Sequence, residues 1–300
     1  MNAAESSSDN RTKKLIILAA VLGTASSSIA ARFTTCPSLI LTLYRMILTC
    51  LIMTGPGLAD LRKHHSELHA EDYFCCFVSG AFLALLIAAS YESLKYTSVA
   101  AAVLLTDSEV FFVAFLQRIF FKEKINAAGW AAIMITFAGS VIVALGDASS
   151  GSGGGNMLKG DLIALAGAFF MAMTSIMGKK CRIRMTNSAY TGLQYLFTLI
   201  VTVLILTATG TPFFGYGAVN YAAAAWQTVI CTLLGLSVFS WGLKFLNAAY
   251  ISTAKLAEPV FSSLLALLIF GEIPPVTTVI GGAVVISGIF LYLRQKDETM

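Results

Sequence analysis

The sequence is poor in charge. Only 12% of its 300 residues are charged and 57% are hydrophobic, whereas soluble domains carry charge on about a quarter of their residues. This chain has too little charge to cover a surface that faces water, which excludes an ordinary soluble domain. Its mean hydropathy of +0.79 indicates that most of its surface faces lipid.

Several motifs of site chemistry are also absent. The six cysteines lack the paired spacing of a zinc site and are interpreted as packing thiols. The three histidines lie in one loop without an HExxH pattern, and no GxxxxGK loop for nucleotide phosphates is present. We therefore expect no metal, no cofactor and no enzymatic activity. The net charge of +4 is interpreted as a signal of membrane orientation, with no nucleic-acid partner.

Long apolar runs fill the chain instead. A helix needs roughly 20 apolar residues to cross a hydrocarbon core about 30 Å thick. No run shows the two-residue alternation of a membrane barrel. The runs predict an all-α integral membrane protein with ten transmembrane helices, at 15–31, 38–58, 73–93, 97–121, 127–146, 161–178, 188–209, 221–243, 250–270 and 275–293. The first run also fits a cleavable signal peptide, but the repeat described next needs it as a helix.

The second half of the chain repeats the first at an offset of 149 residues. The matched residues include charged ones, since Lys95 falls on Lys244, Glu109 on Glu258 and Glu123 on Glu272. Because each half has an odd number of helices, the halves must enter the membrane from opposite sides, which predicts two inverted five-helix repeats. The expected division is a cytoplasmic tail at 1–14, the first repeat at 15–146, a Gly/Ser-rich linker at 147–160, the second repeat at 161–293 and a cytoplasmic tail at 294–300. The first six or so residues are expected to be disordered.

Basic residues predict the orientation. One set of loops holds 13 of them: Arg11, Lys13, Lys14, Arg62, Lys63, Lys122, Lys124, Lys179, Lys180, Arg182, Arg184, Arg294 and Lys296. The opposite set is expected to hold Arg32, Lys95, Lys159 and Lys244. Both termini are therefore expected to be cytoplasmic, in a protein of the plasma (inner) membrane.

Three segments carry a family resemblance. They are Pro37 to Arg45, Tyr96 to Glu123, and Ala257-Glu258-Pro259-Val260 followed by Gly271-Glu272 and a glycine-rich last helix. With them the chain resembles the EamA-type permeases of the drug/metabolite transporter superfamily over positions 15 to 293. Val110 and Lys122 depart from the pattern, since the second half has Pro259 and Gly271 there. The resemblance implies a central cavity and, usually, export of amino acids or other metabolites.

Five charged residues lie inside the predicted helices: Arg45, Asp107, Glu109, Lys255 and Glu258. A charge at mid-membrane costs at least ~2.5 kcal/mol, so each is a candidate functional residue. Lys255 and Glu258 are three apart and share a helix face, and their repeat mates are Thr106 and Glu109. We expect these two faces to meet across a central substrate site. The alternative is that Lys255 and Glu258 form a purely structural ion pair.

Asp107 points away from Glu109 on the same helix. Arg45, whose repeat mate is the neutral Gln194, is expected either to bind a substrate carboxylate or to neutralise Asp107. A carboxylate in an apolar cavity is protonated more easily than in water, so Glu109, Glu258 and Asp107 are candidate proton carriers. The predicted substrate-binding residues are Arg45, Thr106, Glu109, Gln194, Lys255 and Glu258 with the aromatic side chains of Tyr91, Phe112, Trp241 and Phe261.

Three acidic residues at helix ends are candidate gates. Glu92 is expected at the outer boundary, and Glu123 and Glu272 at the cytoplasmic ends of the fourth and ninth helices. Small residues of the last helix, Gly281, Gly282 and Gly288, predict a packing surface within the chain or for a homodimer.

The leading functional hypothesis is a secondary transporter that exports amino acids or other small polar metabolites by alternating access. A cation or multidrug exporter, a metabolite importer, a channel and an intramembrane enzyme are the alternatives. The substrate and the lipid bilayer are the expected partners. The sequence leaves substrate identity, direction and coupling ion open.

Overall fold

The computed structural model describes residues 3–63, 68–93, 96, 102, 105–123, 125–147, 157–271 and 276–293. Within these ranges the chain forms helices and no strands. In chain order they are α1 (Ala3–Arg32), α2 (Ser38–Lys63), α3 (Ala70–Ser93), α5 (Glu109–Phe121), α6 (Ala127–Asp147), α7 (Met157–Arg182), α8 (Asn187–Ala208), α9 (Ala218–Trp226), η3 (Gln227–Leu236), α10 (Ser237–Gly242), α11 (Ala248–Lys255), α12 (Glu258–Phe270) and α13 (Val276–Leu293).

The all-helical membrane architecture is confirmed. Among the described residues, six helical segments are long and apolar enough to cross a membrane: Leu39–Lys63, Ala70–Ser90, Leu158–Arg182, Asn187–Ala208, Ala218–Gly242 and Ala248–Phe270. Ala127–Ile142 and Val279–Tyr292 are shorter apolar helices. The count of ten spans stays a prediction. The first helix begins at Ala3. The expectation that the first six or so residues are disordered is therefore wrong for the residues from Ala3 onward.

Two of the expected helices are interrupted near their middle. The fourth expected helix has a turn at Ser108, after which α5 begins at Glu109. The ninth has turns at Leu256 and Ala257, between α11 and α12. The offset of 149 places these two interruptions at equivalent positions of the halves. The eighth expected helix is continuous, but its middle third, η3, is a π-helix.

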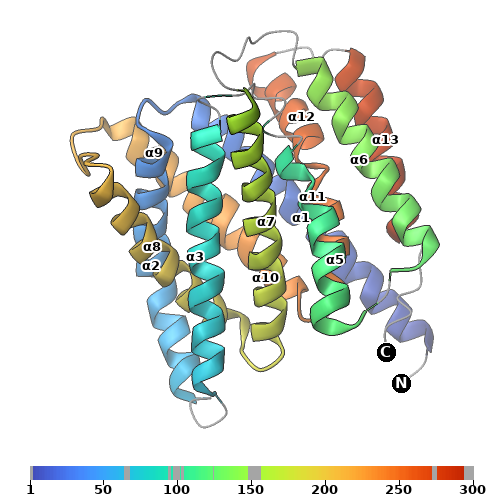
Figure 1. The fold of residues 1–300 in the computed structure, drawn as a ribbon, viewed down its shortest axis with the longest axis horizontal. Helices are drawn as coiled ribbons and strands as arrows, with labels where there is room; N and C mark the ends of the chain where they lie inside the picture. The colour runs from blue at the N-terminus through green and yellow to red at the C-terminus, as the bar shows by residue number, and fades with distance from the viewer. Residues whose placement is uncertain are drawn as a thin grey trace.

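The helices pack in corresponding pairs from the two halves (Figure 1). The helix pairs α2 with α8 and α6 with α13 each join the halves. Contacts of α3 with α7 correspond to contacts of η3 with α1, and contacts of α5 with α7 correspond to contacts of α12 with α1.

The α6 and α13 pair approaches closely because glycines face each other's helix. A Cβ at Gly139 would lie 2.6 Å from the backbone nitrogen of Val285, and one at Gly288 would lie 2.7 Å from that of Thr136. Gly282 packs against Val260. Within the described chain, the small-residue surface of the last helix thus serves contacts inside the molecule.

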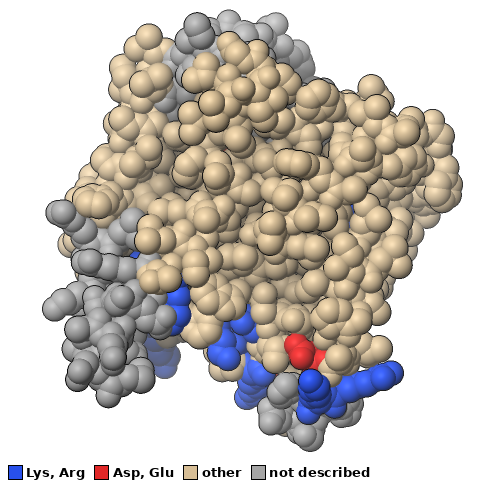
Figure 2. Space-filling view, turned by 180° about the vertical axis from the view of Figure 1, so that it is seen from behind, with Lys and Arg blue, Asp and Glu red and all other residues tan. Residues whose placement is uncertain are grey.

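Charge gathers at one end of the molecule. Figure 1 shows that α1 begins and α13 ends at this end, and Figure 2 shows Lys and Arg clustered there below a broad surface without charge. The ammonium groups of Lys13 and Lys244 lie 4.7 and 6.0 Å from the ring centroid of Phe245. Lys244 therefore belongs to the basic end, and its assignment to the opposite loops is wrong because the chain has already returned there at the end of α10.

The equivalent helices α5 and α12 end on opposite sides. Phe121, the last residue of α5, lies under the ammonium group of Lys179 at the basic end. Phe270, the last residue of α12, stacks against Phe33 just after α1, with ring centroids 5.7 Å apart. Gly271, which follows α12, consequently lies on the side opposite to Glu123, which follows α5. This contradicts the expectation that Glu123 and Glu272 both lie at the cytoplasmic end. Glu272 itself lies outside the described residues.

Candidate functional site

The two helix interruptions place three charges at helix ends. Lys255 is the last residue of α11, and Glu109 and Glu258 are the first residues of α5 and α12. A carboxylate is favourable at a helix N-terminus and an ammonium group at a C-terminus, because unpaired backbone N–H and C=O groups concentrate there. Each charge thus sits at the helix end that stabilises it, although all three lie inside an apolar protein.

An ion pair connects the two interruptions. The ammonium nitrogen of Lys255 lies 3.3 Å from Oε1 of Glu109, and their side chains are 13% and 6% exposed. Lys255 also lies over the ring of Phe239, 5.7 Å from its centroid. The expected pairing of Lys255 with Glu258 is replaced by this pair, because the helix ends at Lys255 and the two residues no longer lie on one continuous helix face.

The remaining carboxylates meet hydroxyl groups. Thr24 on α1 donates to Oε2 of Glu258 at 3.4 Å, and Ser140 on α6 is a partner of Asp107. The second oxygen of Glu109, Oε2, is buried and makes no hydrogen bond in the described chain. Ser252 on α11 faces this carboxylate, and its buried hydroxyl likewise makes no hydrogen bond.

Arg45 is held by the π-helix. Its Nε donates to Oγ1 of Thr232 at 2.5 Å, and Thr228 donates to its backbone oxygen at 3.2 Å. Both threonines lie on η3. The π-helical turns are common at functional positions, and here they bring two hydroxyls to α2. The carboxylate with which Arg45 interacts electrostatically is Glu258, and no interaction of Arg45 is found for Asp107 among the described residues. Neutralisation of Asp107 by Arg45 stays a prediction.

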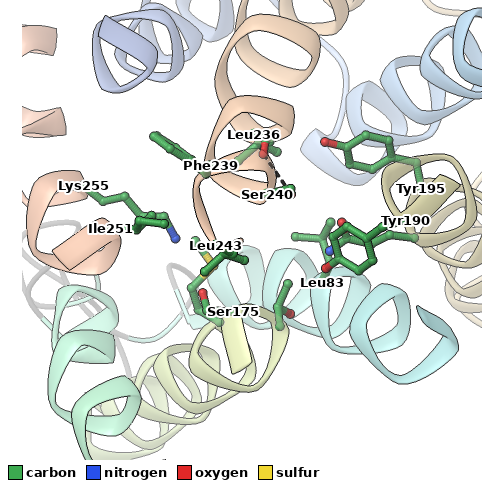
Figure 3. A pocket seen from close by; sticks show the side chains of 13 residues that line it. Leu83, Ser175, Tyr190, Tyr195, Leu236, Phe239, Ser240, Leu243, Ile251 and Lys255 are labelled. Atoms are coloured by element: carbon green, nitrogen blue, oxygen red, sulfur yellow. Dashed lines mark hydrogen bonds between the residues drawn. The ribbon is translucent and has the colours of Figure 1, made fainter. Parts of the chain in front are cut away.

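A small cavity lies beside Lys255 (Figure 3). Its volume is about 50 Å³, far below the ~300–1,000 Å³ of sites for drug-sized ligands. The side chains of Lys255, Tyr190 and Tyr195 point into it from different sides. Its lining residues are Leu83, Met171, Thr174, Ser175, Tyr190, Gln194, Tyr195, Leu236, Phe239, Ser240, Leu243, Ile251 and Lys255. Lys255 is the one charged residue among these described lining residues, and its ammonium group is paired with Glu109.

Hydroxyl and amide groups form a network along one wall of the cavity. Gln194 donates to the hydroxyl of Ser79 at 3.0 Å, and Ser79 and the hydroxyl of Tyr190 lie 2.8 Å apart. The hydroxyl of Tyr195 lies 3.3 Å from that of Ser237. Sequence reasoning did not select Ser79, Tyr190 or Ser252, because a serine or tyrosine in an apolar helix commonly has no more than a packing role.

Several predicted site residues lie elsewhere. Trp241 stacks on Phe245 at the basic end, with ring centroids 5.2 Å apart. Thr106 donates to the carbonyl of Ala102 on its own segment. Phe112 contacts the ring of Phe169 on α7, and Phe261 packs against the main core. Glu92 is half-buried near the end of α3, and the side chain of Tyr91 lies outside the described residues.

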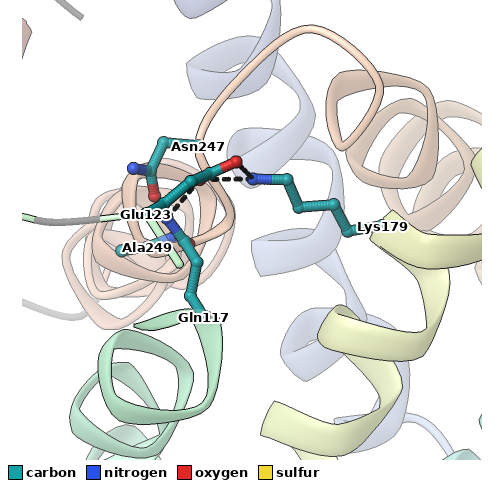
Figure 4. A network of polar contacts seen from close by, with 5 residues as sticks. All are labelled: Gln117, Glu123, Lys179, Asn247 and Ala249. Atoms are coloured by element: carbon teal, nitrogen blue, oxygen red, sulfur yellow. Dashed lines mark hydrogen bonds and ion pairs between the residues drawn. The ribbon is translucent and has the colours of Figure 1, made fainter. Parts of the chain in front are cut away.

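A second polar network lies toward the basic end of the molecule (Figure 4). Lys179 on α7 lies 2.6 Å from Oε2 of Glu123, just beyond α5. Gln117 on α5 donates to the same carboxylate at 2.6 Å and accepts at 3.2 Å from the backbone nitrogen of Ala249 on α11. Three helices that come from both halves are thus tied together by four polar groups.

The caps of α5 and α12 also correspond. Lys122 follows α5 with φ 57° and Gly271 follows α12 with φ 69°. Both are left-handed conformations, and the offset of 149 equates the two positions. Lys122 is the only non-glycine residue with positive φ in the described chain.

Comparisons with known proteins agree with this architecture. The model of the EamA-like transporter family matches residues 12–145 and again residues 158–294. A protein of Clostridium kluyveri named an uncharacterized transporter is 27% identical over 248 residues, which cover 81% of this chain and 79% of that protein. The uncharacterized transporter YxxF of Bacillus subtilis is 25% identical over 295 residues, covering 95% and 89%.

A solved crystal structure has the same fold. It superposes with a TM-score of 0.78 at 18% sequence identity, covering 94% of this chain and 96% of the other. The family model covers most of the chain in two copies, and the long apolar helices make it a multi-pass membrane protein. The chain therefore belongs to the EamA-like transporter family.

Proposed function

We propose that the protein is a secondary transporter that moves a small polar metabolite, such as an amino acid, across the plasma membrane by alternating access. The observation that carries this proposal is the buried Lys255–Glu109 pair between two interrupted helices, beside a cavity. Interrupted helices whose ends face a central site are typical of secondary transporters.

The arrangement of the halves supports an inverted repeat. Corresponding helix pairs pack alike, while α5 and α12 end at opposite sides of the molecule. In such proteins, the two repeats rock about a central site and expose it to each side in turn. The cavity of about 50 Å³ would have to widen to admit a metabolite, as alternating access requires. Cytoplasmic termini and an outward direction of transport are part of the proposal and rest on the basic end and on the family resemblance.

The donor groups of the cavity favour the metabolite class over a cation or multidrug exporter. Among the described lining residues the charged one is a lysine, and its ammonium group can donate hydrogen bonds to a polar or anionic substrate but has no acceptor for a cationic one.

Reconstituted uptake tests the proposal. Purified protein in liposomes is screened with labelled amino acids and carboxylates, with and without a pH gradient, against empty liposomes. We expect uptake of at least one compound and its loss by tenfold or more in Lys255→Gln, because the described lining of the cavity then has no charged residue.

The control is Lys244→Gln, an exposed lysine at the basic end, which should transport like the wild type. Equal transport by Lys255→Gln and the wild type would show that the cavity beside Lys255 does not lie on the transport path. Absence of uptake of every compound by the wild type would reject the proposed function.

A further inference from the structure

We propose that the substrate carries an anionic group which takes the place of Glu109 on Lys255, and that Glu109 binds one proton as it is displaced. This inference rests on the proposed transport function and specifies its substrate class and its coupling. The exchange is balanced. The Lys255–Glu109 ion pair, one substrate anion and one proton from water become a Lys255–anion pair and a neutral Glu109 carboxylic acid.

The placement of Lys255 argues for an anion. Its ammonium group reaches the cavity (Figure 3) and is the one charged group in the part of the lining that the structure describes. The ammonium group donates one hydrogen bond, at 3.3 Å, to Oε1 of Glu109. Because an ammonium group has three donors, it can also donate to a substrate. The other polar lining groups are hydroxyls and an amide, which bind carboxylate oxygens as donors without adding charge.

Two facing polar atoms can accommodate the proton. Oε2 of Glu109 and the hydroxyl of Ser252 are buried without hydrogen bonds, and Ser252 faces that carboxylate. A serine hydroxyl can donate to an ionised Oε2, and its oxygen can accept from a protonated one. Ser252 therefore offers Glu109 a partner in both protonation states, so this carboxyl group can bind and release a proton without being left buried and unpartnered.

The surrounding charges make displacement without a proton costly. Asp107 on the preceding segment and Glu258 on α12 are the carboxylates that interact with Glu109, and Lys255 is the cation. Lys179 and Glu123 pair with each other at the far end of α5. Once Lys255 has taken the substrate, Glu109 would be a buried anion beside two further carboxylates, an arrangement that is strongly unfavourable. Protonation removes that charge.

The pH dependence of binding tests the exchange. The probes are L-lactate, succinate, the proteinogenic amino acids and, as an amine without a carboxylate, ethanolamine. We expect the carboxylate probe that binds wild-type protein to lose affinity by about tenfold per pH unit on the alkaline side, the slope for uptake of one proton. In liposomes with an entrapped pH dye, its uptake should acidify the lumen by one proton per molecule.

Glu109→Gln is the decisive variant, because glutamine can donate to Ser252 and leaves Lys255 without its internal carboxylate. We expect affinity independent of pH, tighter than wild type at alkaline pH, and transport without proton movement. Glu123→Gln removes a lysine-paired carboxylate near the other end of the same helix and should retain the wild-type pH slope whatever its rate. Ser252→Ala should move the whole pH dependence toward higher pH, because an ionised Glu109 then has no serine hydroxyl beside it.

The outcomes separate the two proposals. A wild-type pH slope in Glu109→Gln, or wild-type carboxylate uptake without proton movement, overturns the exchange and leaves the transporter in place. Binding of ethanolamine alone overturns the anionic substrate. Failure of the wild type to move any compound of the uptake screen rejects the transport function itself. If Glu109→Gln does not fold, the wild-type proton count and Ser252→Ala still decide.

Discussion

Lys122 holds a backbone conformation that costs a side chain free energy. At φ 57° it is left-handed, which for a residue with a Cβ costs roughly 1–2 kcal/mol. Gly271 takes the same conformation at the equivalent position without that cost, and a Cβ there would have nothing within 4 Å. The difference between these two caps is therefore a matter of the backbone alone.

We expect Lys122→Gly to stabilise the protein by about 0.5 kcal/mol, since relief of the strain exceeds the extra freedom that glycine gives the unfolded chain. Denaturant unfolding in detergent measures the change. Gly271→Lys is the converse variant and should lose about 1 kcal/mol. A destabilised Lys122→Gly would show that the lysine side chain contributes more than its backbone costs.

The charged site residues could be named from the sequence, because a charge inside an apolar run is conspicuous. Their pairing could not. Spacing puts Lys255 and Glu258 on one face only while the helix is continuous, and it ends between them. The sequence did not mark Ser79 or Ser252 as site residues. Whether a serine hydroxyl in an apolar helix finds a hydrogen-bond partner depends on which helices pack against it.

Among the elements, the positions of the apolar helices were predictable and their internal geometry was not. Pro259 stands at the start of α12, where its ring suits a first helical turn, and it could have signalled that interruption. The interruption before α5 has Val110 instead. The π-helix η3 packs closely against α1, since a Cβ on Gly235 would lie 2.6 Å from Thr24. Such a contact between two distant helices cannot be predicted from the sequence of η3 alone.

The α6 and α13 pair allows a direct test at this scale. We expect Gly139→Ala to destabilise the protein by about 1–3 kcal/mol, because the new methyl group would lie 2.6 Å from the nitrogen of Val285 and force the helices apart. Thermal unfolding of the purified protein measures this. Gly167→Ala on α7 is the matched control, since its Cβ would meet no heavy atom closer than 3.7 Å, and it should gain about 0.5–1 kcal/mol from helix propensity. Equal stability of the two variants would contradict the close packing.

For the whole molecule, the network of Lys179, Glu123, Gln117 and Ala249 closes the basic end. These groups link α5, α7 and α11 across the halves. Because an ammonium group and a carboxylate 2.6 Å apart are partly shielded from water, this contact is worth more than a surface pair. If this network is a gate, as the position of Glu123 predicts, the cavity opens toward this end only when the contact breaks.

We expect Lys179→Gln to raise the accessibility of the cavity from the basic end. Ser175 lines the cavity, and Ser175→Cys should react with a membrane-impermeant thiol reagent several-fold faster in the Lys179→Gln background. Arg184→Gln is the control, since Arg184 is 53% exposed and its contact with Asp72 is 3.8 Å long. Unchanged reactivity in Lys179→Gln would exclude the network as a gate.

The matching left-handed caps have a consequence for the history of the chain. An arrangement with one backbone bend at two positions 149 residues apart, filled once by lysine and once by glycine, is what a gene duplication leaves when side chains diverge and dihedral angles do not. At these two positions the backbone torsion angles are thus more similar between the halves than the residue types are. Two halves that share few identical residues can also be recognised by equivalent positions at which the backbone is left-handed.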